Sequence, residues 1–458
     1  KKDKSTRRVI SNMSLSYLLA DDHTIMLNII EKILCHFESC FSRKAAFRWF
    51  VIIITGLMLR SDKLGVTSIL RDLALAPGCY DSMLHFFRAS SWSLEDIRKR
   101  WFSAVRLYAP LYKEGNFHVL VGDGVKQSKE GRRMPGVKKL FQESENSAKP
   151  EYMHGHMFGG LGILAGNFRS WACIPLSIRL HDGLQAAREW KGASVSTASH
   201  VVQMVEDSYH AALTFGDSLL LLDRYFLTVP ALEKLRELNN SGKVHMEIVT
   251  KAKKSCTAFQ KPGPRKPGRG RPPKKGDAVH LKGLFASHKE QFMETETELY
   301  GKKKTIRYYS IDLLWGQKLY QELRFVLVEM DGIQSILAST SLALDPLSII
   351  RLYSYRFRIE CTFRELKQQT GAFCYHFWSK HMPKLSYYQK KGEPTPLERV
   401  EDERSRKKIL KTVRAIEVHM ELSCIAMGIL QTLSIRFIGK VCSSQIRYQR
   451  TPSKGRVS

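Results

Sequence analysis

The chain has 458 residues, 43% of them hydrophobic and 26% charged, a globular composition long enough for several domains. Lys and Arg number 73 against 44 Asp and Glu, so the net charge is +29 and the protein favours a polyanionic partner, most simply nucleic acid. The 9 cysteines are scattered without a C-x-x-C motif, which argues against a disulfide framework or a structural zinc site and indicates a reducing compartment.

Residues 1–112 are predicted to be helical, because their apolar residues recur at helical spacing. The longest apolar run, Trp49 to Leu59, is too short to cross a bilayer, and no secretory signal is visible, so we expect no membrane partner. Two short predicted helices, at 67–76 and 81–88, flank Pro77-Gly78 and suit either a DNA-reading helix-turn-helix or a plainly packed helical hairpin. The chain begins at Lys1 rather than Met, so we expect its true N-terminus to lie upstream.

From Asn116 the pattern changes to strands that alternate with helices. The predicted elements are strands at 117–121, 154–166 and 171–180, a helix at 198–213, a strand at 218–222, a helix at 230–238 and a strand at 244–250. This order predicts a mixed α/β fold, with one sheet and helices on its faces. Two of the apolar strands end at an aspartate, Asp123 and Asp223.

A basic segment, Lys251 to Lys275, interrupts this order with ten Lys or Arg residues, no acid, and Pro and Gly throughout. Such a composition cannot build a core, so we expect an extended loop. Arg269 and Arg271, in Arg-Gly-Arg-Pro, match a short motif that binds the narrow minor groove of A·T-rich DNA. A solvated basic linker is the alternative.

A polar stripe is predicted further along the chain, after strands at 297–300, 305–315, 323–330 and 334–340. On a helix at 346–369, Tyr353, Arg356, Glu360 and Lys367 fall within about 60° of one another. An ordinary salt-bridged surface helix would show similar pairs, so the stripe alone does not establish a site. A long helix is predicted at 404–438.

Three carboxylates form the candidate catalytic group: Asp123 and Asp223 at strand ends, where clefts open in α/β sheets, and Glu360 on the later helix. Three carboxylates can hold two divalent cations, Mg²⁺ or its substitute Mn²⁺, on oxygen ligands. Two such ions can support displacement at a phosphodiester. A single aspartate after a strand is more often a helix cap or turn former.

The order strand–Asp, strand–Asp, inserted β segment, and a helix with Tyr353, Arg356, Glu360 and Lys367 resembles the DDE transposases of bacterial insertion sequences. Their signature is Tyr, two residues, Arg, three residues, Glu, six residues, Lys, and this chain matches every spacing. The resemblance covers residues 113–378. It implies an RNase H-like catalytic core in which Asp123, Asp223 and Glu360 bind two Mg²⁺ ions.

The resemblance also implies a domain plan and a set of DNA contacts. Tyr353, Arg356 and Lys367 would contact phosphates near the transposon end, and Trp315 would be the base-stacking candidate, although core packing is the favoured interpretation for it. The expected regions are a helical DNA-binding part at 1–112, the core at 113–254 and 346–378, the basic loop and inserted β-rich segment at 255–345, and a helical C-terminal region at 379–458.

The loop after Asp123 is basic and would hold the phosphates of incoming duplex DNA, unless it is merely solvated. Its cations are Lys126, Lys129, Arg132, Arg133, Lys138 and Lys139. His154 and His156 lie on a predicted strand without a third ligand at metal spacing, so we interpret them as structural.

The sequence thus predicts a DNA transposase that binds element ends, cleaves them by hydrolysis and joins 3′ ends to target DNA. The partners expected are double-stranded DNA and a second copy of the chain. The expected location is the bacterial cytoplasm, at the nucleoid. Two alternatives stay open: an RNase H-like nuclease without strand transfer, and a non-catalytic DNA-binding protein derived from a transposase.

Overall fold

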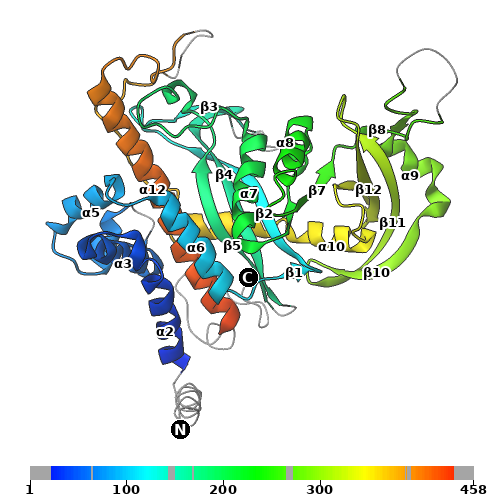
Figure 1. Cartoon of the computed structure of the whole chain (residues 1–458). Helices are drawn as coiled ribbons and strands as arrows, with labels where there is room; N and C mark the ends of the chain where they lie inside the picture. The colour runs from blue at the N-terminus through cyan, green and yellow to red at the C-terminus, as the bar shows by residue number, and fades with distance from the viewer. Residues whose placement is uncertain are drawn as a thin grey trace.

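A mixed β-sheet runs through the computed structural model, with helices packed on both of its faces (Figure 1). The structure describes residues 22–62, 65–142, 150–167, 170–264, 272–386, 388 and 393–437. Within these residues the sheet has 13 strands, so the mixed α/β class predicted from the sequence is observed.

Five strands form the centre of the sheet, in the order β5-β4-β2-β6-β7. β4 pairs antiparallel with β2 and β5, whereas β6 runs parallel to β2 and β7. This arrangement is consistent with the expected RNase H-like core. Short apolar runs such as the fully buried β6 suit strands that helices cover on both faces. The bounds are β2 Phe117–Ser128, β4 Tyr152–Asn167, β5 Ser170–Leu180, β6 Ser218–Leu221 and β7 Met246–Ala252, with the short β1 Lys113–Glu114 beside β2 and β3 Lys138–Phe141 beside β4.

The strands between β7 and the next long helix extend the same sheet. β13 pairs antiparallel with β7, and successive antiparallel pairs add β12, β11 and β10. In Figure 1 they curve into a separate lobe beside the central strands. Their bounds are β8 Thr257–Phe259, β9 Ala278–His280, β10 Met293–Leu299, β11 Lys302–Trp315, β12 Gln321–Met330 and β13 Ile333–Ser339, with the short helix α9 Leu284–Ser287 between β9 and β10.

Helices cover the central strands on opposite faces. α7 and α8 lie on one face, and a long C-terminal helix, α12, packs on β5 with α3, α5 and α6 around it (Figure 1). The bounds are α2 Asp22–Cys35, α3 Lys44–Leu59, α4 Thr67–Asp72, α5 Cys79–Arg88, α6 Leu94–Tyr108, α7 His200–Phe215, α8 Val229–Asn239 and α12 Glu403–Arg436. Among the described helices, α12 alone is long and apolar enough to cross a membrane, but 89% of its most apolar stretch is buried inside the protein.

The helix predicted at 346–369 is two helices, so the expectation of one continuous polar stripe is wrong. α10 spans Pro346–Tyr355 and α11 spans Arg358–Gln368. Between them the backbone hydrogen bonds span three residues instead of four: Arg356 N donates to Tyr353 O at 3.1 Å and Glu360 N donates to Phe357 O at 3.0 Å. This three-residue hydrogen-bonding pattern changes the rotation per residue, so α11 no longer continues the faces of α10.

Candidate active site

Asp123 lies near the middle of β2, with its side chain only 20% exposed. One carboxylate oxygen accepts a hydrogen bond from the backbone N–H of Gly124 at 2.8 Å, and the other accepts from Arg356 Nη1 at 3.2 Å. Burial raises the pKa of Asp123 to about 6, although the Arg356 guanidinium opposes this shift. A cation that approaches this partly desolvated carboxylate would stabilise its ionised form.

Arg356 joins two of the three predicted carboxylates. Its Nη2 donates to Glu360, one helical turn further along, while its Nη1 holds Asp123. Arg356 itself is 15% exposed, so its charge is poorly screened by water. The first turn of α11 therefore brings Glu360 to β2 through a shared guanidinium.

A glycine on the neighbouring strand sets how closely α11 approaches the sheet. Gly160 of β4 pairs directly with Asp123 in the antiparallel ladder, so the two residues face the same side. A Cβ at Gly160 would lie 2.5 Å from the ring of Phe363, which is buried on α11. The missing side chain makes room for Phe363, and Glu360, three residues earlier, is thereby seated beside Asp123.

Asp223 follows β6, as predicted, and caps a single 3₁₀ turn over Arg224–Phe226. Its carboxylate accepts from Arg224 N at 2.6 Å, and its backbone carbonyl accepts from Thr250 Oγ1 at 2.9 Å. Its negative charge adds to the rise in the Asp123 pKa and favours the charged form of Arg356, which places it in the same electrostatic cluster.

Two pockets lie near Arg356, which lines one of them and hydrogen-bonds to two residues that line the other. One, of about 470 Å³, is lined by Asp123 and Glu360 together with Lys126, Arg364 and Lys367. The other, of about 310 Å³, is lined by Asp223, Arg224, Lys251, Tyr300, Tyr353, Ser354, Arg356 and Phe357. The four signature residues are thus divided between two pockets, with Tyr353 and Arg356 in one and Glu360 and Lys367 in the other.

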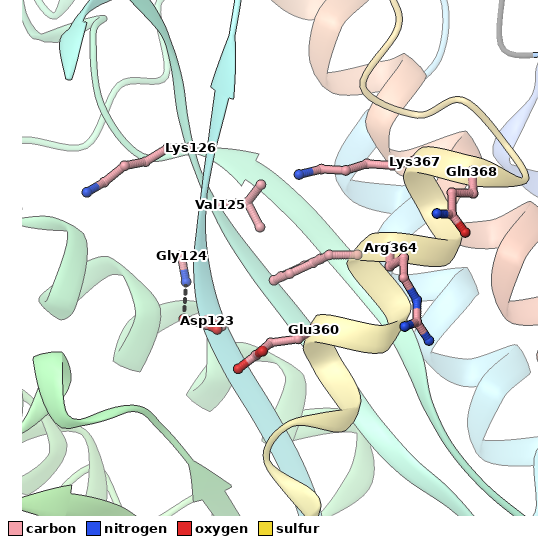
Figure 2. Close-up of a pocket in the computed structure, with 9 residues that line it drawn as sticks. Asp123, Gly124, Val125, Lys126, Glu360, Arg364, Lys367 and Gln368 are labelled. Carbon is pink, nitrogen blue, oxygen red and sulfur yellow. Dashed lines mark hydrogen bonds between the residues drawn. The ribbon is translucent and has the colours of Figure 1, made fainter. Parts of the chain in front are cut away.

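The first pocket opens between β2 and α11. Figure 2 shows Glu360 and Lys367 projecting from the helix toward the strand, whereas Lys126 leaves the strand on the opposite side. Lys126 Nζ donates to Phe141 O at 2.8 Å. Lys367 Nζ lies 5.3 Å from the centre of the Phe373 ring. Of the two lysines, Lys367 is the one directed into the space beside Asp123.

The cations of the loop after Asp123 are mostly engaged within the protein. Lys129 is buried and donates to the carbonyls of Phe373 and Tyr375 at 2.7 and 3.0 Å. Because its ammonium is buried on these internal carbonyls, Lys129 is structural and the expectation of a phosphate contact there is wrong; burial also lowers its pKa to about 8. Arg133 donates to two carbonyls, of Lys380 and Met382, and Lys138 pairs with Asp182 at 2.6 Å. Arg132 and Lys139 are exposed, with Lys139 Nζ 4.4 Å from the Tyr152 ring.

The remaining candidates lie outside both pockets or outside the described residues. Trp315, at the end of β11, is half-buried against the core, which agrees with core packing. His156 is fully buried, with Tyr375 Oη at 2.5 Å and Pro135 O at 2.8 Å from its ring nitrogens, so its structural interpretation is confirmed. Arg269 and Arg271 lie outside the described residues.

A buried histidine chain behind β2 was missed in the sequence. His181 shares hydrogen bonds with Asp207 at 2.9 Å and with His200 at 2.8 Å. The second ring nitrogen of His200 finds no partner among the described residues, and a Cβ at Gly124 would lie 2.8 Å from it. The only sequence signal was the glycine after Asp123, since His181 and His200 are unremarkable in isolation. His200 packs against the backbone beside Asp123, on the face of β2 opposite α11.

The donor set suits a hard divalent cation. Asp123 and Glu360 offer carboxylate oxygens on either side of one positive group, the Arg356 guanidinium, and Asp223 contributes charge from the adjoining pocket. No three acidic, His or Cys side chains within the described ranges approach closely enough to hold one ion. Asp123 and Glu360 line the same pocket, so their carboxylates could both face an ion bound there.

Comparison with known families agrees with this chemistry. A family model described as "DDE superfamily endonuclease" matches residues 36–309, more than half of the chain. The chain therefore belongs to the DDE superfamily of endonucleases, whose members generally use divalent metal ions on nucleic acid. The match includes Asp123 and Asp223 and ends before Glu360. A search of curated proteins found no match.

Proposed function

We propose that this DDE endonuclease is a transposase that binds the ends of a mobile element, cleaves them by hydrolysis and joins the 3′ ends to target DNA. The observation that carries the proposal is the meeting of Asp123 and Glu360 on Arg356, from elements more than two hundred residues apart. A surface salt-bridged helix would not bring its carboxylate to a buried aspartate at the centre of a sheet. The four signature residues at their full spacing support the narrower class.

Each group in the site has a distinct task in this proposal. Asp123, Glu360 and Asp223 would hold divalent ions, which when bound act as Lewis acids at the scissile phosphate. Lys367 lies two turns beyond Glu360, about 10 Å along α11, and would bind a phosphate next to the one that is cut. Arg356 holds Asp123 and Glu360 together through its two hydrogen bonds. DNA phosphates would compete with the two carboxylates for Arg356, and metal ions would compete with Arg356 for the carboxylates.

The test is a cleavage assay on the DNA that flanks the coding region, where short inverted repeats would supply the element ends. Asp123→Ala, Asp223→Ala and Glu360→Ala should each abolish Mg²⁺- or Mn²⁺-dependent cleavage while end binding stays largely intact. Lys367→Ala and Arg356→Ala should weaken end binding and flatten its salt dependence, because each removes about one phosphate contact. Affinity and cleavage are measured on the same end fragments.

Glu233→Ala is the matched control, since it removes an exposed carboxylate from α8 and should leave cleavage unchanged. Full cleavage by the Glu360→Ala protein would refute the assignment of Glu360 as a catalytic residue. A wild-type protein that binds ends but cuts none across a titration of Mg²⁺ and Mn²⁺ would favour the non-catalytic alternative.

A nuclease that cuts without joining is the second candidate, because the family description specifies an endonuclease and no strand transfer. Incubating pre-cleaved ends with a supercoiled plasmid distinguishes a transposase from a nuclease without strand transfer. Joined products are expected for a transposase. Hydrolysis without joined products would support the nuclease without strand transfer.

A further inference from the structure

A basic surface with an exposed tryptophan lies beside the candidate active site, and we infer that it binds unpaired nucleotides of the same DNA. The Trp378 surface consists of Trp378, Arg132, Lys380 and Lys384. Trp378 is 57% exposed and the three cations are also exposed. The inference rests on the proposed function, because it assigns a second contact for the DNA that enters the site.

Two chain segments far apart in the sequence build this surface. The backbone N–H of Ser379 donates to Arg133 O at 3.1 Å, and that of Leu385 donates to Arg132 O at 2.8 Å. Arg133 adds two side-chain bonds to carbonyls of the second segment. The loop after Asp123 is therefore hydrogen-bonded to residues 379–385, and both segments carry exposed cations, Arg132 on one and Lys380 and Lys384 on the other.

Trp378 is exposed although its neighbours are firmly held. Phe377 is 5% exposed and packs on Phe87 at 5.5 Å, while Ser379 is 7% exposed. This alternation is typical of extended chain, in which successive side chains point to opposite sides. The Lys129 ammonium further anchors the segment through the carbonyls of Phe373 and Tyr375. The indole is thus presented to solvent by a fixed backbone.

The surface is close to the catalytic pocket. Phe373 lies under Lys367, which lines the pocket with Asp123 and Glu360. Trp378 follows Phe373 by five residues, so the two backbones are separated by at most about 18 Å. A strand that occupies the pocket would extend onto the Trp378 surface within a few nucleotides.

The charge balance selects nucleic acid over a protein partner. The Trp378 surface carries three exposed cations, Arg132, Lys380 and Lys384, and the two segments that build it, residues 126–139 and 371–385, contain a single acid, Glu130. A second copy of the chain would place the same cations opposite themselves across a two-fold interface. A phosphate backbone matches the cations, and an exposed indole offers a stacking face. Because bases within a duplex are already stacked, the indole can accept only unpaired ones.

The test uses the full chain with Glu360→Ala and a chelator present, so that binding is read without cleavage. The probes are a blunt duplex of mixed sequence and the same duplex with a single-stranded extension of about eight nucleotides. Trp378→Ala should weaken binding of the extended probe about tenfold and of the blunt duplex far less, because one stacked base is lost. Trp378→Phe should keep most of the preference. Affinities are measured by fluorescence polarisation across a salt series.

Two controls and two contrary outcomes make the test decisive. Ile333→Ala removes an apolar side chain of similar exposure, 62%, from the start of β13 and should not change the preference. Lys380→Ala with Lys384→Ala should flatten the salt dependence more than Lys282→Ala with Lys289→Ala. An unchanged preference in Trp378→Ala overturns the inference. A change in the oligomeric mass of Trp378→Ala, with DNA binding unaltered, overturns it in favour of a protein interface. If the wild-type protein cleaves no DNA, the proposed function is contradicted, but the difference in affinity between the extended and blunt probes still tests the Trp378 surface.

Discussion

At the scale of single residues, the candidate site is governed by one arginine between two carboxylates. Arg356 donates hydrogen bonds to both Asp123 and Glu360, and its positive charge opposes the rise in the Asp123 pKa, which burial still raises to about 6. A carboxyl group with a raised pKa is costly to ionise in the folded protein. A second cation close to Asp123 would offset this cost, because it favours the ionised form.

This raised pKa predicts a measurable loss of stability as pH rises. The pKa of Asp123 is near 3.8 when unfolded and about 6 when folded, so the folded state binds more protons between these values. The free energy of unfolding should therefore fall by about 2 kcal/mol from pH 4 to pH 7, in the presence of a chelator. Asp123→Asn should lack this component. Urea denaturation of both proteins at the two pH values gives the difference, and equal pH dependence would contradict the prediction.

At the scale of elements, the contact between α11 and the sheet decides where Glu360 lies. Gly160 leaves the space that Phe363 fills, and the tight turn between α10 and α11 re-aims the second helix. Neither feature acts on DNA. Both are needed for Glu360 to reach β2.

Gly160→Ala should therefore disturb the site without touching a functional group. Its Cβ would lie 2.5 Å from the Phe363 ring, so we expect a stability loss of about 1–3 kcal/mol and lower cleavage, with end binding less affected. Adding Phe363→Leu should restore part of both. Gly283→Ala is the control, since a Cβ there meets nothing within 4 Å. Full cleavage by Gly160→Ala would show that α11 is not positioned through Phe363.

At the scale of the whole molecule, α12 joins the N-terminal helices to the catalytic sheet. It packs on β5, α3, α5 and α6, and the same apolar core includes Phe50 of α3 and Ile425 of α12. Within this core Arg98 Nε donates to Glu421 at 2.9 Å, and the Glu421 side chain is fully buried. The ion pair ties α6 to α12.

Removing one partner of the Arg98–Glu421 ion pair should destabilise the protein more than replacing both partners with apolar residues. Arg98→Ala leaves a buried carboxylate without its partner, so we expect a loss of about 3–5 kcal/mol in the free energy of unfolding. Arg98→Met with Glu421→Leu should lose much less, because neither charge remains. Lys99→Ala, an exposed residue on the same helix, should change stability by less than about 0.5 kcal/mol. Chemical denaturation measures all three, and equal losses in the single and double variants would refute the argument.

Local pattern predicted most of the elements correctly. The buried strand before Asp223 and the long helix at 404–438 appear close to their expected bounds. These features depend on side-chain periodicity, which is a property of neighbouring residues. The strand predicted at 117–121 continues to Ser128, so the expectation that Asp123 lies at a strand end is wrong. The break at Arg356 was not predicted, because Pro and Gly are absent there and residues 346–369 are helical in composition throughout.

The sequence by itself determined the residue types available for catalysis, the spacing of Tyr353, Arg356, Glu360 and Lys367, and the charge that favours nucleic acid. Only the tertiary structure decided which cations of the basic loop are bound by other parts of the protein, since Lys129 and Arg133 bind carbonyls some 240 residues away. It also brought Arg356 between Asp123 and Glu360, and left Trp378 exposed on a segment that is hydrogen-bonded to the loop after Asp123. These outcomes depend on contacts between distant segments, and periodicity along the chain carries no information about such contacts.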